Sequence, residues 1–162
     1  MEIEVRTAQH GDAEAVARLM LQLGYESGAA AVADRLSRIL LRPDHRFLIA
    51  EAGGRPAGWL HATVFEFVET GPFVVIAGLV VDRSFRRQGV GRLLMWRAEA
   101  WAVEKGCSIV RLWSSDARKE AHRFYEHLGY SHIKTQYSFV KSVDPSGSRD
   151  FAAFVPRVSD DA

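Results

Sequence analysis

Residues 73–102 are the stretch that most restricts how this chain can fold. Residues 73–81 are apolar without interruption and rich in β-branched side chains, as expected of a strand buried between two layers. A turn with two glycines follows, and beyond it apolar residues recur at helical spacing, namely Val90, Leu94, Ala98 and Trp101. A buried strand, a glycine turn and a helix in succession predict an α/β fold.

The turn itself has the composition of an anion site. It contains Gly89 and Gly91, and arginine occupies positions 83, 86, 87 and 92. Glycine lets the backbone approach a ligand, and the amides of a first helical turn are free to bind an anion. We therefore predict that the turn binds phosphate, although a turn with solvated arginines is an alternative that the motif alone leaves open. A dinucleotide fingerprint would need glycine in place of Leu94, and a P-loop would need Gly-Lys-Ser/Thr where the chain has Gly91-Arg92-Leu93.

Two motifs point to one family. Arg86-x-x-Gly89-x-Gly91 resembles the acetyl-CoA pyrophosphate loop of the GNAT superfamily of N-acetyltransferases, and residues 78–82 resemble the strand that precedes it. Residues 121–130, with Ala121, Phe124-Tyr125 and Gly129-Tyr130, resemble the second signature of the family. The motifs occur in the family order and together cover residues 73–130. Arg118 is a departure, because many relatives carry asparagine there, and this puts one polar contact to the cofactor in doubt.

The resemblance implies roles for particular residues. The pyrophosphate of acetyl-CoA would be bound at Arg86, Arg87, Gln88, Gly89, Val90, Gly91 and Arg92. The pantetheine amides would pair with the backbone of Leu79, Val80 and Val81, and Ala121 would complete the cofactor site. The amide of Val81 would stabilise the oxyanion, and Tyr125 would be the general acid for the departing thiolate.

The resemblance further implies an enzyme that transfers acetyl from acetyl-CoA to a primary amine of a small molecule, by direct attack in a ternary complex. Tyr25, Glu26 and Glu69 are predicted to contact the acceptor amine. The general base stays open: the candidates by neighbourhood are Glu66, Glu69, His61, Asp116 and His132, and an amine with a lowered pKa that is deprotonated through ordered water would need none of them. A protein or peptide N-acetyltransferase of the same fold and a CoA-binding module without catalysis are the alternative functions.

Periodicity and turn residues predict a mixed sheet, antiparallel in its N-terminal part with a parallel central pair, flanked by helices. The expected strands are 1–7, 46–51, 56–66, 73–81, 107–113 and 130–143. The expected helices are a first one capped by Asp12 and ended at Gly24, then 29–41, a long one up to Lys105-Gly106, and one capped within 114–116 and ended at Gly129. We predict a single N-acetyltransferase domain over residues 1–143 and a C-terminal tail over 144–162.

Composition limits partners and location. The formal net charge is +1, so no nucleic acid is expected, and Cys107 has no Cys or His at metal-ligand spacing, so no metal is expected. Residues 1–20 lack the features of a signal peptide and no run is long enough to span a membrane, so a cytoplasmic protein is predicted. Phe151, Phe154 and Val155 could dock the tail on the body or on a second subunit, which makes a homodimer plausible.

Overall fold

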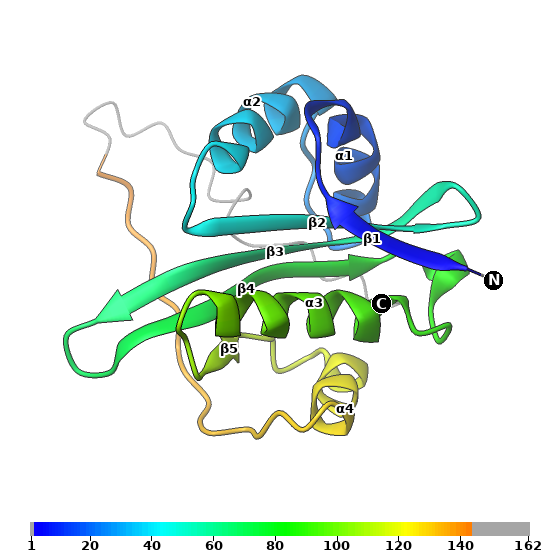
Figure 1. The fold of residues 1–162 in the computed structure, drawn as a ribbon. Coiled ribbons are helices and arrows are strands. Elements are labelled where there is room, and N and C mark those ends of the chain that lie inside the picture. Colours follow the sequence, from blue (N-terminus) through cyan, green and yellow to red (C-terminus); the bar gives the residue numbers. More distant parts are fainter. Residues whose placement is uncertain (1, 144–162) are drawn as a thin grey trace. The chain divides into compact units, whose positions relative to one another are not determined.

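The computed structural model describes residues 2–143. Its five-stranded sheet has the order β1-β2-β3-β4-β5, antiparallel up to β4 and parallel between β4 and β5. The strands are β1 (Ile3–Thr7), β2 (His45–Ala52), β3 (Arg55–Phe67), β4 (Gly71–Val81) and β5 (Val110–Leu112). The helices are η1 (His10–Asp12), α1 (Ala13–Leu21), α2 (Ala29–Leu40), η2 (Arg83–Phe85), α3 (Val90–Glu104) and α4 (Lys119–His127). The predicted mixed α/β sheet is therefore confirmed (Figure 1).

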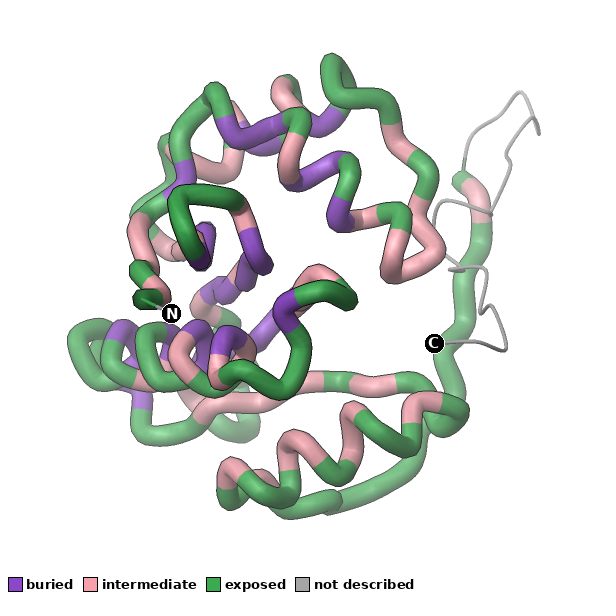
Figure 2. The backbone as a smooth tube through the Cα atoms, turned by 90° about the vertical axis from the view of Figure 1, so that its right-hand side faces the viewer, coloured by how far each residue is buried: buried purple, intermediate pink, exposed green. Residues whose placement is uncertain are grey.

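Helices cover both faces of the sheet, with α1 and α2 on one face and α3 on the other (Figure 1). Strand alternation directs Phe47, Ile49, Trp59 and Val80 into the core under α1 and α2, where Val16, Leu19 and Leu36 meet them. Buried segments, purple in Figure 2, lie mainly in the sheet and on the inner sides of these helices. The long apolar run of β4 follows from this arrangement, because residues 73–76 are buried in the interior of the sheet.

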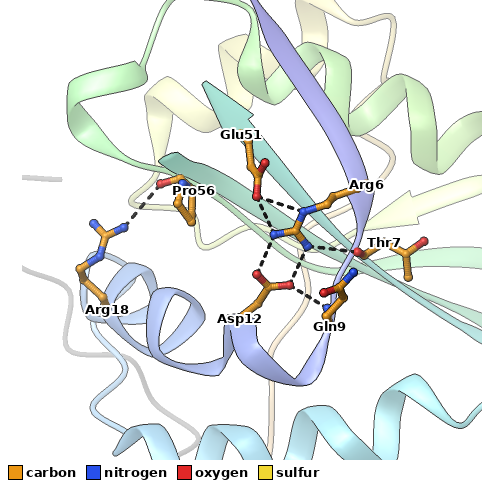
Figure 3. Close-up of polar contacts among 7 residues, drawn as sticks. All are labelled: Arg6, Thr7, Gln9, Asp12, Arg18, Glu51 and Pro56. Atoms are coloured by element: carbon orange, nitrogen blue, oxygen red, sulfur yellow. Dashed lines mark hydrogen bonds and ion pairs between the residues drawn. The ribbon is translucent and has the colours of Figure 1, made fainter. Parts of the chain in front are cut away.

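The start of α1 corrects one prediction. Asp12 precedes the helix, but its side chain makes no capping hydrogen bond to it. Its carboxylate instead accepts two hydrogen bonds of 2.8 Å from Arg6 and one of 2.7 Å from the backbone amide of Gln9. Arg6 also donates to Glu51 on β2, so this cluster joins β1, η1 and β2 (Figure 3).

The predicted closing strand over residues 130–143 is wrong, because the structure has no strand there. Tyr137 and Phe139 are each 92% exposed, so the alternation of apolar residues in this segment does not mark a buried face. Apolar alternation yields a strand only where a neighbouring strand supplies hydrogen bonds, and sequence does not specify that neighbour. The predicted cap of α4 is also wrong, because Arg118 precedes that helix and no side chain caps it.

The described residues form two compact units that divide after Trp113. The sheet, α1, α2 and α3 belong to the first unit, and α4 belongs to the second. The single-domain assignment for residues 1–143 stays a prediction, and the tail at 144–162, with its proposed role in a dimer, lies outside the described residues. Within residues 2–143, none of the helices has the length and apolar character that crossing a membrane requires.

Candidate active site

The loop before α3 is shaped for an anion. Gly89 precedes the helix with φ 89°, a left-handed conformation that glycine adopts without strain, and Arg87 also has a positive φ of 60°. The first hydrogen bond of the helix runs from the amide of Leu93 to the carbonyl of Gly89 at 3.0 Å. The amides of residues 90–92 therefore have no intrahelical acceptor and point out of the helix start, where an anion is also favoured by the helix dipole.

Contacts from α1 hold this loop in place. The carboxylate of Asp82 accepts hydrogen bonds from the Ser84 amide at 2.9 Å and hydroxyl at 2.7 Å. Arg18 pairs with the same carboxylate at 3.0 Å, and Gln22 accepts a hydrogen bond from the backbone amide of Arg83 at 3.1 Å. The hydroxyl bond from Ser84, followed by the Ser84 amide and Arg18, lowers the pKa of Asp82 against the opposing effect of burial. The loop therefore keeps its shape through an anionic anchor on its inner side.

The polar side chains of the predicted loop are exposed, and several already have partners. Arg86 donates to the carbonyl of Val81 at 3.4 Å, and Gln88 donates to the carbonyl of Ser84 at 3.1 Å. The guanidinium of Arg92 lies 5.1 Å from the centre of the Trp96 ring. Val90, by contrast, is buried and anchors the start of α3.

The strand that leads into this loop loses one neighbour halfway along its length. β5 pairs with β4 only at residues 74–76, whereas β3 pairs with it as far as Val81. Ala77 is skipped by the β3 register, which makes it a β-bulge at the point where the β5 pairing stops. Residues 77–81 therefore present an edge that no strand among the described residues covers.

Alternation along the strand tells which amides face this edge. The amide of Asp82 donates to Ala57 on the β3 side at 2.8 Å. Backbone groups of successive residues point in opposite directions, so those of Val81 and Leu79 point away from β3, toward the open edge. Val80 is turned back toward β3. Of the three β4 residues that were predicted to contact a cofactor, Leu79 and Val81 thus direct their backbone groups toward the open edge, where the Val81 carbonyl accepts a hydrogen bond from Arg86.

A cavity of about 180 Å³ lies between the sheet and the two N-terminal helices. It is lined from α1, α2, β2, β3 and β4 by Val16, Met20, Val32, Arg35, Leu36, Ile39, Phe47, Trp59, His61, Ala77 and Gly78. Gly78 is needed for its shape, because a Cβ there would lie 2.7 Å from the ring of Trp59. Since Ala77 and Gly78 also begin the open edge of β4, the cavity and the edge meet at the bulge.

His61 is the only histidine among the cavity residues, and it is paired with a second histidine. Its Nε2 lies 2.8 Å from Nδ1 of His45, and the two rings stack with centroids 5.1 Å apart. The Phe47 ring stacks on both His61 and Trp59, with ring centroids 5.4 Å and 5.3 Å apart, respectively. Burial, with a smaller contribution from His45, lowers the pKa of His61 to about 4, so this ring is neutral at pH 7.

Tyr125 and Ala121 lie on α4, in the second unit. The Tyr125 ring packs edge-on against Phe124 at 5.2 Å and against Tyr130 at 6.1 Å, measured between ring centroids. Burial raises the pKa of Tyr125, and the charge of Arg118 opposes this shift. The phenol therefore carries its proton at neutral pH, which suits a proton donor.

The structure does not bring all of the predicted acceptor contacts and candidate bases to the cavity. Tyr25 and Glu26 lie in the connection between α1 and α2, and Glu69 lies in the exposed turn between β3 and β4; none of the three lines the cavity. Of the candidate bases, only His61 does. Sequence reasoning missed Arg35, Phe47, Trp59 and His45 as cavity neighbours, although the hairpin register that pairs Phe47 with His61 could have indicated two of them. No group of three or more potential metal ligands occurs within residues 2–143.

Comparison with curated proteins gives relatives at low identity. An uncharacterized N-acetyltransferase of Methanocaldococcus jannaschii is 27% identical over 65% of this chain and 47% of its own length, so the chain spans about half of that relative. The aminoalkylphosphonate N-acetyltransferase of Salmonella typhimurium is 28% identical over 86% of this chain and 91% of its own length. The aminoglycoside N(6')-acetyltransferase type 1 of Acinetobacter haemolyticus is 30% identical over 60% of this chain and 70% of its own length.

Solved structures share the fold. The aminoglycoside N-acetyltransferase AAC(6')-Iy in complex with CoA superposes with a TM-score of 0.79 at 23% identity, covering 86% of this chain and 95% of that one. The relatives are N-acetyltransferases, the class of enzyme that the sequence predicted. A model described as the Acetyltransferase (GNAT) family matches residues 13–130. The family resemblance of the two motifs is thereby confirmed: the chain belongs to the acetyltransferase (GNAT) family.

Proposed function

We propose that this protein transfers the acetyl group of acetyl-CoA to the primary amine of a small molecule, by direct attack of the amine in a ternary complex. One observation supports this most strongly: the loop of residues 82–92, here called the anion loop, the open edge of β4 and the cavity follow one another without a gap. The loop begins directly after Val81, and the other end of the edge, at Ala77 and Gly78, lines the cavity. A long ligand with a diphosphate at one end and a reactive acyl group at the other suits this order.

In this proposal the amides of residues 87–92 bind the diphosphate of acetyl-CoA, and the arginines of the loop add positive charge. The outward backbone groups of Leu79 and Val81 pair with the pantetheine amides, which would otherwise be buried without partners. The outward-facing amide of Leu79, which lies nearer the cavity end of the edge than Val81, then stabilises the oxyanion that forms when the carbonyl is attacked. The phenol of Tyr125 donates the proton that neutralises the departing thiolate.

The cavity limits the acceptor. Its volume of about 180 Å³ is below the roughly 300–1,000 Å³ of sites that enclose drug-sized ligands. Its lining is apolar apart from Arg35 and His61, and no carboxylate is among the described residues that line it. A polycation such as an aminoglycoside would lose hydration there without gaining a counter-charge. We therefore propose a compact amine with an apolar body, for which Arg35 can pair with an anionic substituent.

An assay of thiol release tests the proposal and its substrate class. The panel contains an arylalkylamine, an aminoalkylphosphonate, an aminoglycoside, a polyamine and a peptide with a free N-terminus. We expect the first two to be acetylated with the highest kcat/KM. Higher kcat/KM for the peptide would instead favour a protein N-acetyltransferase. Binding of acetyl-CoA without turnover of any member would favour a CoA-binding module.

The cofactor loop can be tested separately, by titration calorimetry with CoA. Gly89→Leu places a side chain at the anion loop, and we expect the Kd of CoA to rise at least ~10-fold, as if one charge-assisted hydrogen bond were lost. Gly54→Leu is the matched control, because Gly54 also has a positive φ, 72°, with no atom near its missing Cβ, and lies in the β2–β3 turn. An unchanged Kd for a folded Gly89→Leu protein would contradict the loop assignment.

A further inference from the structure

His61 lies at the end of the cavity that meets the open edge of β4, next to the place proposed for the attacking amine. It is paired across the sheet with Gly78, and both residues line the cavity at the start of the open β4 edge. Neutral amines attack thioesters, and the nitrogen must lose a proton as the bond to carbon forms. A proton acceptor within reach of that nitrogen, directly or through one water, assists this step. Among the described lining residues, His61 is the only side chain with a nitrogen lone pair that can accept one.

The hydrogen bonds around His61 determine which of its nitrogens is available. In the pair of His61 Nε2 and His45 Nδ1, at 2.8 Å, one nitrogen must carry the proton and the other must accept it. On the far side of His45, Nε2 lies 3.9 Å from the carboxylate of Asp44. This negative charge favours a proton on Nε2 of His45, which leaves its Nδ1 as the acceptor.

The protonation of His45 in turn determines which nitrogen of His61 carries a proton. If Nδ1 of His45 accepts, Nε2 of His61 donates, and the lone pair of His61 lies on Nδ1. That nitrogen makes no hydrogen bond to any described residue. The carboxylate of Asp44 thus favours, through His45, the tautomer of His61 whose Nδ1 is the acceptor nitrogen.

Burial, more than the charges around the pair, keeps His61 neutral until it reacts. Asp44 and Arg42 flank His45 at the start of β2, and Arg42 lowers the pKa of Asp44 by hydrogen bonding, so this carboxylate is ionised at neutral pH. Burial, and after it Arg42, lower the pKa of His45. From α2, Arg35 is the one charged group that lines the cavity with His61, while α1 and β4 contribute no titratable side chain to the lining.

We propose that Nδ1 of His61 accepts the proton of the attacking amine, and that His45 positions His61 by accepting the hydrogen bond from its Nε2. The inference rests on the proposed function. In the step, the amine nitrogen forms a bond to the acetyl carbon and the C–S bond breaks. The nitrogen proton passes to His61, and the thiolate takes the proton of the Tyr125 phenol. After the products leave, His61 gives its proton to water and the Tyr125 phenolate takes one from water, so both residues return to their starting states. His61 is thus a catalytic residue, and His45 is a positioning residue.

The tautomer can be measured without any turnover. Nitrogen NMR of ¹⁵N-histidine protein distinguishes the protonated from the unprotonated ring nitrogen. We expect His61 to be neutral at pH 7 with its proton on Nε2, and to shift toward the other tautomer in His45→Phe. A proton on Nδ1 of His61 in the wild-type chain would overturn the proposal, and this result stands whether or not an amine has been found.

Kinetics with the best amine of the panel test the role itself. We expect His61→Ala to lower kcat/KM ~10²–10⁴-fold, the usual contribution of a general base, with an unchanged Kd for CoA. Imidazole added to His61→Ala should restore part of the lost rate, which a purely structural role would not allow. His10→Gln, at an exposed histidine in η1, is the matched control and should behave as the wild type. A folded His61→Ala protein within about threefold of wild type would overturn the proposal.

His45 needs a readout of its own. Gln can accept a hydrogen bond from Nε2 of His61 through its amide oxygen, whereas Phe cannot. We expect His45→Phe to lose at least ~10-fold in kcat/KM and His45→Gln to recover most of it. Equal losses in both variants would remove the positioning role. A wild-type chain that acetylates no amine but shows the expected tautomer would reject the proposed function, and the NMR result would still describe the histidine pair.

Discussion

The hydroxyl of Tyr125 can be separated from the ring that bears it. The ring packs between Phe124 and Tyr130, within the second unit, so removal of the oxygen alone leaves these contacts intact. Burial raises the pKa of Tyr125, and a phenol with a raised pKa holds its proton across the neutral range. Packing and proton donation are thus two properties of one residue that substitution can distinguish.

We expect Tyr125→Phe to lower kcat about 10²-fold, in line with the loss of a general acid, while the Kd of acetyl-CoA stays within twofold. Steady-state kinetics and calorimetry on the same preparation measure both. Tyr130→Phe serves as the control, since it removes a hydroxyl from the neighbouring ring. Turnover of Tyr125→Phe equal to that of wild type would reject the acid role.

At the scale of elements, the Arg6 cluster joins three segments that are distant in sequence. Arg6 on β1 pairs with Asp12 at 2.8 Å and with Glu51 on β2 at 2.6 Å. The hydrogen bonds from Arg6 are the main cause that lowers the pKa of Asp12, and the side chain of Asp12 is only 10% exposed. An ionised Asp12 therefore stabilises the folded chain relative to the unfolded one.

We expect Asp12→Asn to lower the free energy of unfolding by about 2 kcal/mol at pH 7, the usual value for hydrogen bonds to a charged group. Because the folded pKa lies below the ordinary 3.8, this contribution is complete above pH 3.8 and is lost as the pH falls further. Urea unfolding at pH 7 and at pH 3 measures the difference, which should shrink at the lower pH. Asp34→Asn breaks an exposed pair with Arg38 and should cost under about 0.5 kcal/mol. Equal losses in the two variants would contradict this account.

For the whole molecule, the histidine pair makes stability depend on pH in a range that lies mostly above the ordinary pKa values of carboxylates. The pKa of His61 is about 4 in the folded chain and 6.5 in the unfolded chain. As the pH falls from 6.5 toward 4, the unfolded chain binds a proton that the folded chain does not. Acidification therefore favours unfolding, and the lowered pKa of His45 acts in the same direction.

We expect the free energy of unfolding to fall by roughly 2–3 kcal/mol between pH 6.5 and pH 4, at about 1.4 kcal/mol per pH unit at most for one group. Urea titrations at intervals of half a pH unit measure the slope. His61→Gln removes the titrating ring, so its slope should be shallower over the same interval. An identical slope in wild type and variant would mean that His61 is not the group responsible.

Local sequence patterns predicted the anion loop and most elements because the forces involved are local. A run of β-branched residues is typical of a buried strand, and glycine before Val90 allows the left-handed turn that starts α3. Residues 130–143 show where this reasoning ends. Their alternation predicted a strand, but no partner strand pairs with them among the described residues.

The cavity could not be predicted in the same way, because its walls come from five elements. From the sequence, His61 was one of several candidate bases, and Arg35 was not identified as a site residue. Only the register of β2, β3 and β4, together with the position of α2, brings His61, His45 and Gly78 to one place. Glu69, which the sequence offered as one of three acceptor contacts, lies in an exposed turn and does not line the cavity.

By itself, the sequence determined the family, the glycine turn and the order of the elements from β1 to α4, since each depends mainly on local patterns of residues. The tertiary structure alone decided where β5 leaves β4, which backbone amides face the open edge, and which histidine meets the cavity. Those features arise when hydrogen bonds and side-chain packing join segments dozens of residues apart. No local pattern encodes such pairings, because each depends on which neighbour the rest of the fold supplies.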